Sequence, residues 1–219
     1  MIKKTLKSNK YFNFIYRRIL YPNLSQPEKD IYYLRNLNFN YSLDIGANVG
    51  TYSIELSKIS KKVIAFEPIK KIFKRTKEYL PKNVFLNNFA LGNCIKNKKI
   101  FTPIQKNTDI EYALSSIKNK SKYFTSEVIA VKKFDFIFKK KKFLNKIDFI
   151  KIDTEGYEYE IILGMKKFLK KNNPIFLIEI EKKHNKEFEK FFLLMKNLGY
   201  KVCIFDNKKK FLKNIDFKL

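Results

Sequence analysis

The stretch SLDIGANVG, Ser42 to Gly50, predicts a buried strand that runs directly into a glycine turn. Turns of this kind hold nucleotides at the carboxyl ends of strands in open α/β sheets. The chain has six glycines among 219 residues, where about 15 would be usual, so Gly46 and Gly50 are expected to meet a backbone requirement. A dinucleotide fingerprint would need glycine at the positions of Asn48 and Thr51, and no Lys-Ser or Lys-Thr pair follows at the offset of a phosphate loop. The two common phosphate-binding patterns are therefore excluded.

Apolar strands alternate with amphipathic helices from residue 41 onward. Runs such as YSLDI, KVIAFEP, NVFLNNFAL, KIDFIKID and NPIFLIEIE each predict one strand, and EGYEYEIILGMKKFLKK predicts one helix. This alternation predicts an α/β fold whose mostly parallel sheet is covered on both faces. The runs KVCIF and FLKNIDFKL predict an antiparallel hairpin at one edge, at the C-terminal end. We expect one domain over residues 41–219, preceded by a helical cap over the basic and aromatic residues 1–40.

The formal net charge of +26 has two interpretations. It fits an anionic partner such as nucleic acid, anionic lipid or an acidic glycan. However, four of the 47 basic residues are arginine, and Lys, Asn, Ile, Phe and Tyr abound while Trp is absent, which is typical of AT-rich codons. A selected phosphate-binding surface would recruit arginine for its bidentate geometry. Nucleic acid is therefore not expected as a partner, although the charge leaves it open.

The two cysteines and the hydropathy of the chain bear on its location. Cys94 and Cys203 lie far apart in the sequence, which fits a reducing compartment. No apolar run reaches the roughly 18 residues of a transmembrane helix, and the start of the chain lacks the apolar core of a signal peptide. We expect a cytoplasmic protein, with peripheral contact at the inner membrane face left open by the basic, aromatic residues 1–40. The oligomeric state is left open as well.

The charge at the glycine turn favours a cationic ligand without phosphate. Asp44 ends the strand two residues before Gly46, so its carboxylate would repel a pyrophosphate and attract a cation. S-adenosylmethionine carries an ammonium, a sulfonium and no phosphate, and Asp44 with the backbone N–H groups of residues 46–50 would hold its amino acid end. Glu67 ends the next strand, where an acid typically accepts the ribose hydroxyls, and Pro68 stiffens the turn that follows.

Four residues near the ends of two later strands are candidates for the chemistry. IKIDTEGYE places Asp153 and Glu155 at the end of one strand, and LIEIEKKH places Glu179 and His184 at the end of the next. Methyl transfer from a sulfonium is an in-line displacement, and a hydroxyl acceptor also needs a base for its proton. All four residues are candidates for that base, in chemistry expected to need no metal ion. The alternative roles are helix capping for Glu155 and a solvent-facing loop position for His184.

Six segments resemble the FkbM family of class I S-adenosylmethionine-dependent methyltransferases. They occur in family order between about residues 42 and 184: SLDIGANVGTYSIELSK, VIAFEPIKKIF, NVFLNNFALGN, LSSI, IDFIKIDTEGYEYEIILGM and PIFLIEIEKKH. The resemblance implies a Rossmann-like sheet of seven strands and O-methylation, commonly of sugar or polyketide hydroxyls. It suggests that Glu67 lies at the ribose, that Asn88 or its neighbours lie near the adenine, and that Asp153 and Glu155 lie at the methyl-transfer face. Tyr157 departs from the usual alanine of the family and is expected to narrow, or stack on, the acceptor site.

The sequence therefore predicts an S-adenosylmethionine-dependent O-methyltransferase that acts on a hydroxyl of a glycan, such as a surface polysaccharide precursor, or of a related small molecule. The residues expected to contact the cofactor are Asp44, Gly46, Ala47, Asn48, Gly50, Thr51, Glu67, Pro68 and Asn88. Tyr112, Tyr123 and Tyr157 are candidates to stack on a sugar. Two alternatives remain: an RNA or protein methyltransferase, motivated by the charge, and a non-catalytic nucleoside-binding scaffold. The Asn/Asp-Pro-Pro-Tyr motif of many enzymes that methylate amino groups of nucleic acids is absent.

Overall fold

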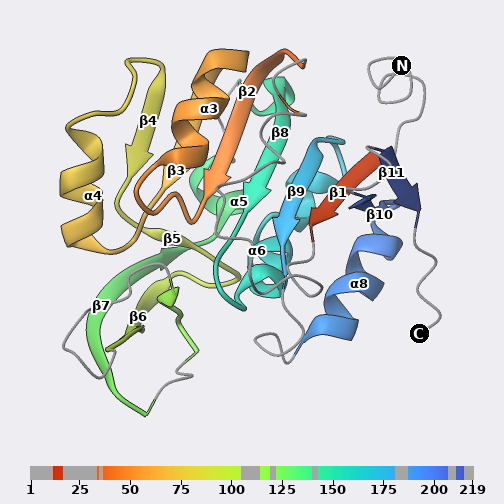
Figure 1. The fold of residues 1–219 in the computed structure, drawn as a ribbon. Helices are drawn as coiled ribbons and strands as arrows, with labels where there is room; N and C mark the ends of the chain where they lie inside the picture. The colour runs from red at the N-terminus through yellow and green to blue at the C-terminus, as the bar shows by residue number, and fades with distance from the viewer. Residues whose placement is uncertain are drawn as a thin grey trace.

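The computed structural model describes residues 12–16, 34, 37–104, 114–118, 122–139, 143–180, 187–206 and 211–214. Within them the chain forms one large sheet, one small sheet, and helices on both faces of the large sheet (Figure 1). No helix in this described part is long and apolar enough to cross a membrane.

The large sheet contains eight strands among the described residues, in the order β11 (Phe211–Asn214), β10 (Lys201–Asp206), β1 (Phe12–Tyr16), β9 (Ile175–Glu179), β8 (Ile147–Ile152), β2 (Phe39–Ile45), β3 (Ser60–Phe66) and β4 (Val84–Asn87). All neighbouring pairs are parallel except β10 and β11 at one edge. This confirms the α/β class, the mostly parallel sheet and the antiparallel edge hairpin. The parallel strands all point the same way, so their carboxyl ends gather at one edge, at the bottom of Figure 1.

Two expectations about this sheet need correction. The expected count of seven strands is not confirmed, because the described order contains eight. One of the eight, β1, lies inside residues 1–40, where a helical cap was expected, and it pairs in parallel with both β9 and β10. Its sequence FNFIY is rich in aromatic and β-branched residues, which favour strands. Apart from β1, Leu34 and residues 37–40, the expected cap lies outside the described residues.

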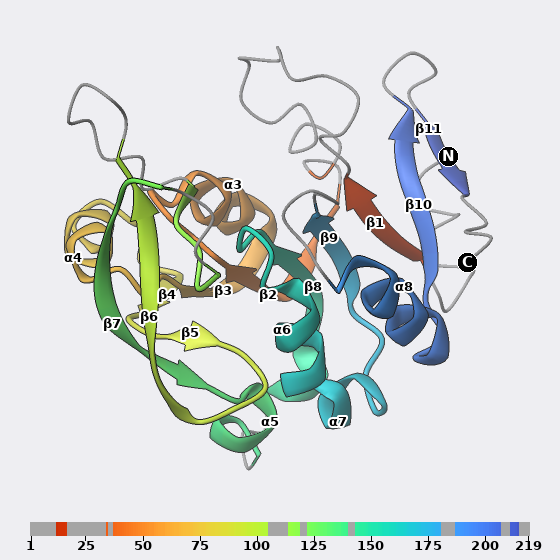
Figure 2. The same cartoon turned by 90° about the horizontal axis from the view of Figure 1, so that it is seen from below.

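A three-stranded sheet with the order β5 (Ala90–Leu91), β7 (Phe124–Lys132) and β6 (Lys96–Pro103) lies beneath the carboxyl ends of β2, β3 and β4 (Figures 1 and 2). Its first strand corrects the expectation that NVFLNNFAL forms one strand. The run divides because β4 pairs with β3 whereas β5 pairs with β7. At the break, the side-chain amide of Asn88 donates to the carbonyl oxygens of Glu67 (3.0 Å) and Pro68 (2.9 Å), which turns the chain away from the large sheet.

Helices connect the strands and cover the large sheet. They are α3 (Thr51–Ile59), α4 (Lys70–Lys77), α5 (Phe134–Ile137), a 3₁₀ helix (Leu144–Lys146), α6 (Glu158–Gly164), α7 (Lys166–Leu169) and α8 (Phe188–Asn197). Viewed from below, α3 lies on one face of the large sheet and α6 and α8 lie on the other (Figure 2). The single helix expected after β8 is divided at Met165 into α6 and α7. The carboxylate of Asp135 accepts the backbone N–H groups of Lys167 and Phe168, which starts α7 as a separate helix.

Side chains that alternate along the central strands form two separate cores. Ile150 and Ile152 of β8 belong to the larger core, which includes buried residues of α6 and α8. Phe149 of the same strand belongs to the smaller core, with Tyr52 and Leu56 of α3. This division follows from the two-residue period of a strand, and it explains why β8 has apolar residues on both of its faces: both are buried.

Candidate functional site

An open pocket lies where the carboxyl ends of β2, β3 and β8 meet the small sheet. The strand β2 lies between β3 on one side and β8 on the other, so the direction in which strands are added reverses at this point. Ligands of open α/β sheets bind at such a switch point. The empty space between its walls, including the solvent at its open mouth, is about 650 Å³. The residues that line it are Ile45, Gly46, Asn48, Phe66, Glu67, Pro68, Ile69, Ala90, Leu91, Ile100, Ser115, Ser116, Ile117, Asp153, Thr154, Glu155 and Tyr157.

The glycine turn after β2 forms one wall of the pocket. Gly46 has φ 83°, and a Cβ atom there would lie 1.8 Å from the carbonyl oxygen of Asp153, so only glycine fits between the ends of β2 and β8. The N–H groups of Gly46 and Ala47 both donate to the carbonyl oxygen of Phe66, and that of Gly50 donates to Ala47. These three N–H groups close the turn, and the expectation that the N–H groups of residues 46–50 hold the amino acid end of a ligand stays a prediction.

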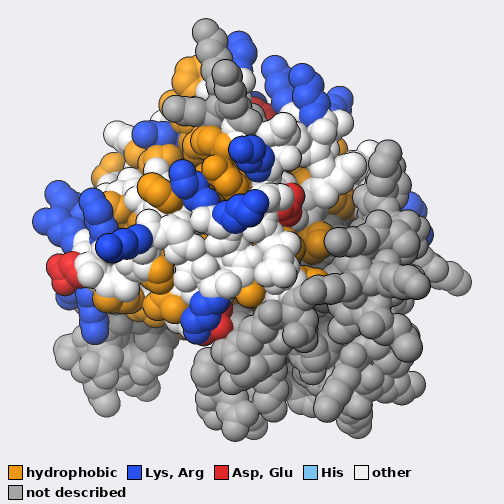
Figure 3. Space-filling view, turned by 90° about the horizontal axis from the view of Figure 1, so that it is seen from above, with side chains coloured by type: hydrophobic (Ala, Val, Ile, Leu, Met, Phe, Trp, Pro, Cys, Tyr) orange, Lys and Arg blue, Asp and Glu red, His pale blue; other side chains and the backbone are white. Residues whose placement is uncertain are grey.

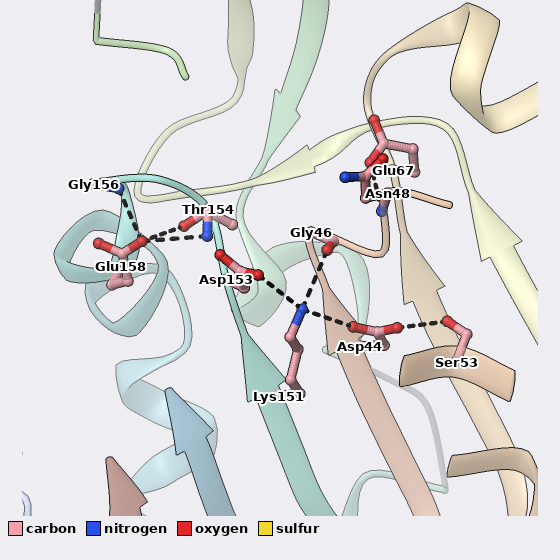
Figure 4. A network of polar contacts seen from close by, with 10 residues as sticks. All are labelled: Asp44, Gly46, Asn48, Ser53, Glu67, Lys151, Asp153, Thr154, Gly156 and Glu158. Carbon is pink, nitrogen blue, oxygen red and sulfur yellow. Dashed lines mark hydrogen bonds and ion pairs between the residues drawn. The ribbon is translucent and has the colours of Figure 1, made fainter. Parts of the chain in front are cut away.

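Glu67 joins the turn to the start of α4. One carboxylate oxygen accepts the N–H of Asn48 (2.9 Å) and the other accepts the N–H of Ile69 (2.8 Å), as Figure 4 shows for Asn48. The side chain is buried yet lines the pocket. Burial raises the pKa of Glu67 to about 7, although both N–H groups act to lower it. This acid therefore lies where the sequence predicts a ribose-binding carboxylate, with its protonation sensitive to pH near neutrality.

Asp44 does not line the pocket, and its side chain is fully buried. Its Oδ2 accepts a hydrogen bond from Ser53 (2.6 Å), and its Oδ1 lies 3.8 Å from Nζ of Lys151 without a hydrogen bond (Figure 4). Burial raises the pKa of Asp44, while Lys151 and Ser53 act against the rise. The carboxylate thus has a cationic partner inside the protein, and the predicted contact with a ligand cation stays a prediction.

Lys151 is the centre of this polar network, although it is 4 % exposed. Its ammonium lies 3.3 Å from Oδ2 of Asp153 and 3.5 Å from the carbonyl oxygen of Gly46, and it also lies over the ring of Tyr52. Burial lowers the pKa of Lys151, but Asp153, Asp44 and Glu179 outweigh that effect and raise it overall. The ammonium therefore stays charged and links the end of β2 to the end of β8.

The turn between β8 and α6 is built around a further buried acid, Glu158. Glu158 accepts the N–H groups of Thr154 (3.3 Å) and Gly156 (3.0 Å) and the hydroxyl of Thr154 (3.0 Å), all on the same oxygen (Figure 4). Burial raises the pKa of Glu158. Helix α6 starts at Glu158, and Tyr157 before it provides no side-chain cap. Glu158 thus holds N–H groups that precede the helix, and Glu155 lines the pocket with φ 53°, while the capping role considered for Glu155 stays an alternative.

The wall opposite the glycine turn comes from Tyr157 and from residues 114–118. The hydroxyl of Tyr157 accepts a hydrogen bond from Lys98 of β6 (2.7 Å). Ser116 forms a two-way backbone bridge with Phe101 of the same strand. The small sheet and Tyr157 therefore line one side of the pocket. The contact of Tyr157 with a methyl acceptor stays a prediction.

The structure brings six of the predicted site residues together in the pocket lining: Gly46, Asn48, Glu67, Pro68, Asp153 and Glu155. Six others lie near it without lining it: Asp44, Ala47, Gly50, Thr51, Asn88 and Glu179. Among these, Thr51 is exposed at the start of α3, and Asn88 braces the turn after β3. His184 and Tyr112 lie outside the described residues, and Tyr123 is 63 % exposed. In the described part of the chain, no group of three His, Cys, Asp or Glu residues is arranged to hold a metal ion.

Three residues of the site were missed by the sequence analysis. Lys151 had a usable signal, because a charge within the apolar run FIKI is costly to bury unless it is paired. The same argument applies to Glu179, a charged residue at the end of the apolar run FLIE. Glu158 and Ser116 had no comparable signal, since a glutamate early in a helix and a serine in a loop are ordinary positions.

Comparison with known proteins gives a family and several solved structures. The model of the family described as "Methyltransferase FkbM domain" matches residues 44–202. A methyltransferase FkbM from Methylobacillus flagellatus KT is 14 % identical over 75 % of this chain, with TM-score 0.48. The precorrin 8w decarboxylase of Methanobacterium thermoautotrophicum is 15 % identical over 84 % of this chain and 82 % of its own, with TM-score 0.43. The chain covers 39 % of the Methylobacillus protein. No curated protein sequence matches the chain.

Proposed function

The chain belongs to the FkbM methyltransferase family, and on this premise we propose that it transfers a methyl group from S-adenosylmethionine to a hydroxyl of a glycan or a related small molecule. When bound, S-adenosylmethionine would supply the electrophilic methyl group. The alternatives to a glycan acceptor are an RNA or a protein, which the charge of +26 keeps open.

The observation that carries the proposal is an excess of acid beside the pocket. Glu67, Asp153 and Glu155 line the pocket, and no lysine or arginine is among the described residues that line it. A ligand phosphate would be repelled here, whereas an ammonium and a sulfonium would be attracted. The charge therefore supports a methyl donor of this kind over a phosphorylated nucleotide.

The polar atoms of the pocket fit the two ends of such a donor. The Oδ1 atom of Asn48 is buried and accepts no hydrogen bond within the described structure, so it is available to the amino group. Each carboxylate oxygen has lone pairs for about two hydrogen bonds, and Glu67 uses one on each oxygen. The ribose hydroxyls are therefore able to donate to Glu67 without breaking its contacts with Asn48 and Ile69.

The position of Asp153 and Glu155 in the pocket lining supports a role on the acceptor side. Both line the pocket beside the turn after β8, whereas Glu67 lies at the end of β3. In the proposed step the acceptor oxygen bonds to the methyl carbon as the carbon–sulfur bond breaks, and a carboxylate takes the hydroxyl proton. The ion pair with Lys151 holds Asp153 in place at 3.3 Å. We therefore propose Asp153 or Glu155 as the base.

Two measurements test this function. Calorimetry with S-adenosylhomocysteine is expected to show binding by the wild type and a loss of at least about tenfold in affinity for Glu67→Ala, which removes charge-assisted hydrogen bonds. Radiolabelled methyl transfer into fractionated cell extract then identifies the acceptor class, and comparison of Asp153→Asn with Glu155→Gln identifies the base as the residue whose replacement abolishes transfer. Absence of binding by the wild type, or equal binding by Glu67→Ala, would contradict the proposed cofactor. Label in RNA or protein rather than glycan would contradict the proposed acceptor.

A further inference from the structure

Glu155 has a backbone conformation that glutamate rarely adopts. Its φ of 53° lies in the left-handed region, which glycine enters freely and other residues enter at a cost. Among the described residues, the non-glycine positions with positive φ are Asn48 and Glu155, and both line the pocket. Asparagine tolerates this region, whereas glutamate persists there only when its surroundings hold it. Contacts around Glu155 must therefore hold it in this conformation.

The peptide unit between Glu155 and Gly156 is held from both sides. Its carbonyl oxygen accepts a hydrogen bond from the hydroxyl of Ser116 (2.8 Å), and its N–H donates to the carboxylate of Glu158 (3.0 Å). Ser116 and Glu158 are 3 % and 1 % exposed, so water does not compete with either contact. Two contacts at opposite ends of one peptide fix its plane, and with it the backbone of Glu155.

Ser116 is itself fixed within a short strap, residues 114–118, that joins the small sheet to α6. The backbone N–H and carbonyl groups of Ser116 pair with those of Phe101 at 2.9 and 2.8 Å. The hydroxyls of Ser115 and Thr102 lie 2.9 Å apart. At the other end, Lys118 forms an ion pair with Glu160 of α6 (3.4 Å). The strap is therefore anchored on both elements that it joins, and Ser116 is held where its hydroxyl meets Glu155.

We propose that Ser116 is a positioning residue for the methyl acceptor: with Glu158 it clamps the Glu155–Gly156 peptide and holds Glu155 in the pocket wall. This inference rests on the proposed function, because Glu155 is one of the two carboxylates proposed as the base. Loss of the Ser116 hydroxyl lets Glu155 relax toward an ordinary φ and moves its carboxylate away from the acceptor. The cofactor contacts of Asn48 and Glu67 lie on the other wall and stay unchanged.

The clamp is testable without any knowledge of the acceptor. The dipeptide Glu-Gly occurs once in the sequence, at Glu155–Gly156. Protein labelled with ¹³C at glutamate carbonyls and ¹⁵N at glycine therefore gives one carbonyl–nitrogen correlation in NMR, from the clamped peptide itself. We expect Ser116→Ala to move this signal clearly and the control Ser126→Ala, at an exposed serine of β7 that does not line the pocket, to leave it nearly in place. An unmoved signal in Ser116→Ala, or an equal movement in both variants, would overturn the clamp.

The consequence for the reaction is tested in the extract fraction that the wild type labels. Ser116→Ala is expected to lower kcat by about tenfold or more through misplacement of the base, with affinity for S-adenosylhomocysteine within about twofold of the wild type. Ser116→Thr, which keeps the hydroxyl, should restore most of the rate. The proposal fails if Ser126→Ala loses as much activity, or if weaker cofactor binding explains the loss. A wild type that binds no S-adenosylhomocysteine contradicts the proposed function instead, and the NMR signal then still decides the clamp.

Discussion

Glu67 is the residue whose protonation is expected to affect the proposed binding of the methyl donor. It is 4 % exposed, it lines the pocket, and both of its oxygens accept backbone N–H groups. Burial raises its pKa to about 7, so the free protein at neutral pH holds a mixture of the protonated and ionised forms. Ligand hydroxyls donate more strongly to the ionised form, so binding and deprotonation of Glu67 favour each other.

The affinity for S-adenosylhomocysteine is therefore expected to rise with pH up to the pKa of about 7 and to level off above it. Below that pH the affinity should fall by at most about tenfold per pH unit, since one proton must leave on binding. Calorimetry at several pH values measures the effect, and Glu67→Gln, which cannot ionise, should flatten it. A wild-type profile parallel to that of Glu67→Gln would show that another group is responsible.

Lys151 is expected to be a large single contributor to stability. Lys151→Met leaves Asp44 and Asp153 without their ammonium partner, and breaking a buried ion pair costs about 3–5 kcal/mol. Urea unfolding should show this loss, whereas the control Lys58→Met, which removes an exposed pair with Glu55, should cost under about 1 kcal/mol. The double variant Asp44→Asn/Lys151→Met should regain part of the loss. Equal effects of the two Lys→Met substitutions would contradict the assigned role.

At the scale of elements, the site depends on how short segments begin and end. The run after β8 forms two helices because Asp135 of α5 supplies acceptors for the first N–H groups of α7. The run NVFLNNFAL, which follows α4, forms two strands because Asn88 bends the chain toward the small sheet. Each break is made by a side-chain contact between residues far apart in the sequence. Both breaks shape the region behind or beside the pocket.

Asp135→Ala is expected to lower the free energy of unfolding by about 1–2 kcal/mol, the usual effect of removing a helix cap. Asp135→Asn keeps one acceptor oxygen and should lose less. Urea unfolding measures both, and calorimetry should show unchanged affinity for S-adenosylhomocysteine, since Asp135 does not line the pocket. No change in stability would mean that α7 starts without this cap.

At the scale of the whole molecule, the acidic residues that line the pocket contrast with the basic charge of the protein. Lysine and arginine side chains are spread over the face at the amino ends of the parallel strands, which Figure 3 shows from above. Asp44, Glu67 and Asp153 lie at or near the carboxyl ends. The protein as a whole carries +26, yet its pocket is acidic. Anions should therefore bind to exposed lysines at the surface, whereas the proposed methyl donor should bind in the acidic pocket.

Thermal unfolding distinguishes these two ways of binding. S-adenosylhomocysteine at about 100 times its Kd should stabilise the protein by about 2.7 kcal/mol, or roughly 5–10 °C in Tm for a chain of this size. This shift should survive about 0.5 M salt, because the contacts are buried. Any shift caused by ATP should disappear there, because exposed lysines are screened. A salt-resistant shift with ATP, or none with S-adenosylhomocysteine, would contradict the acidic pocket.

Much of the fold and part of the site follow from local sequence. The alternation of apolar strands and helices predicts the α/β class, and the spacing of Gly46, Asn48 and Gly50 excludes the phosphate-binding patterns. Glu67 and Asp153 are predictable because an acid that ends a buried parallel strand must lie at the same edge as the turn after β2. Residues 12–16 were misassigned because a short aromatic segment satisfies helical and strand periods alike.

The sequence by itself thus determined the fold class, the family, and the strand ends that meet at the pocket, because each of these depends on periods and spacings within a short stretch of chain. Only the tertiary structure decided the partners: Lys151 between Asp44 and Asp153, Glu158 beneath the turn after β8, and Ser116 against Glu155. These contacts join residues brought together by strand pairing and by the position of the small sheet, and no local pattern specifies which buried charge meets which.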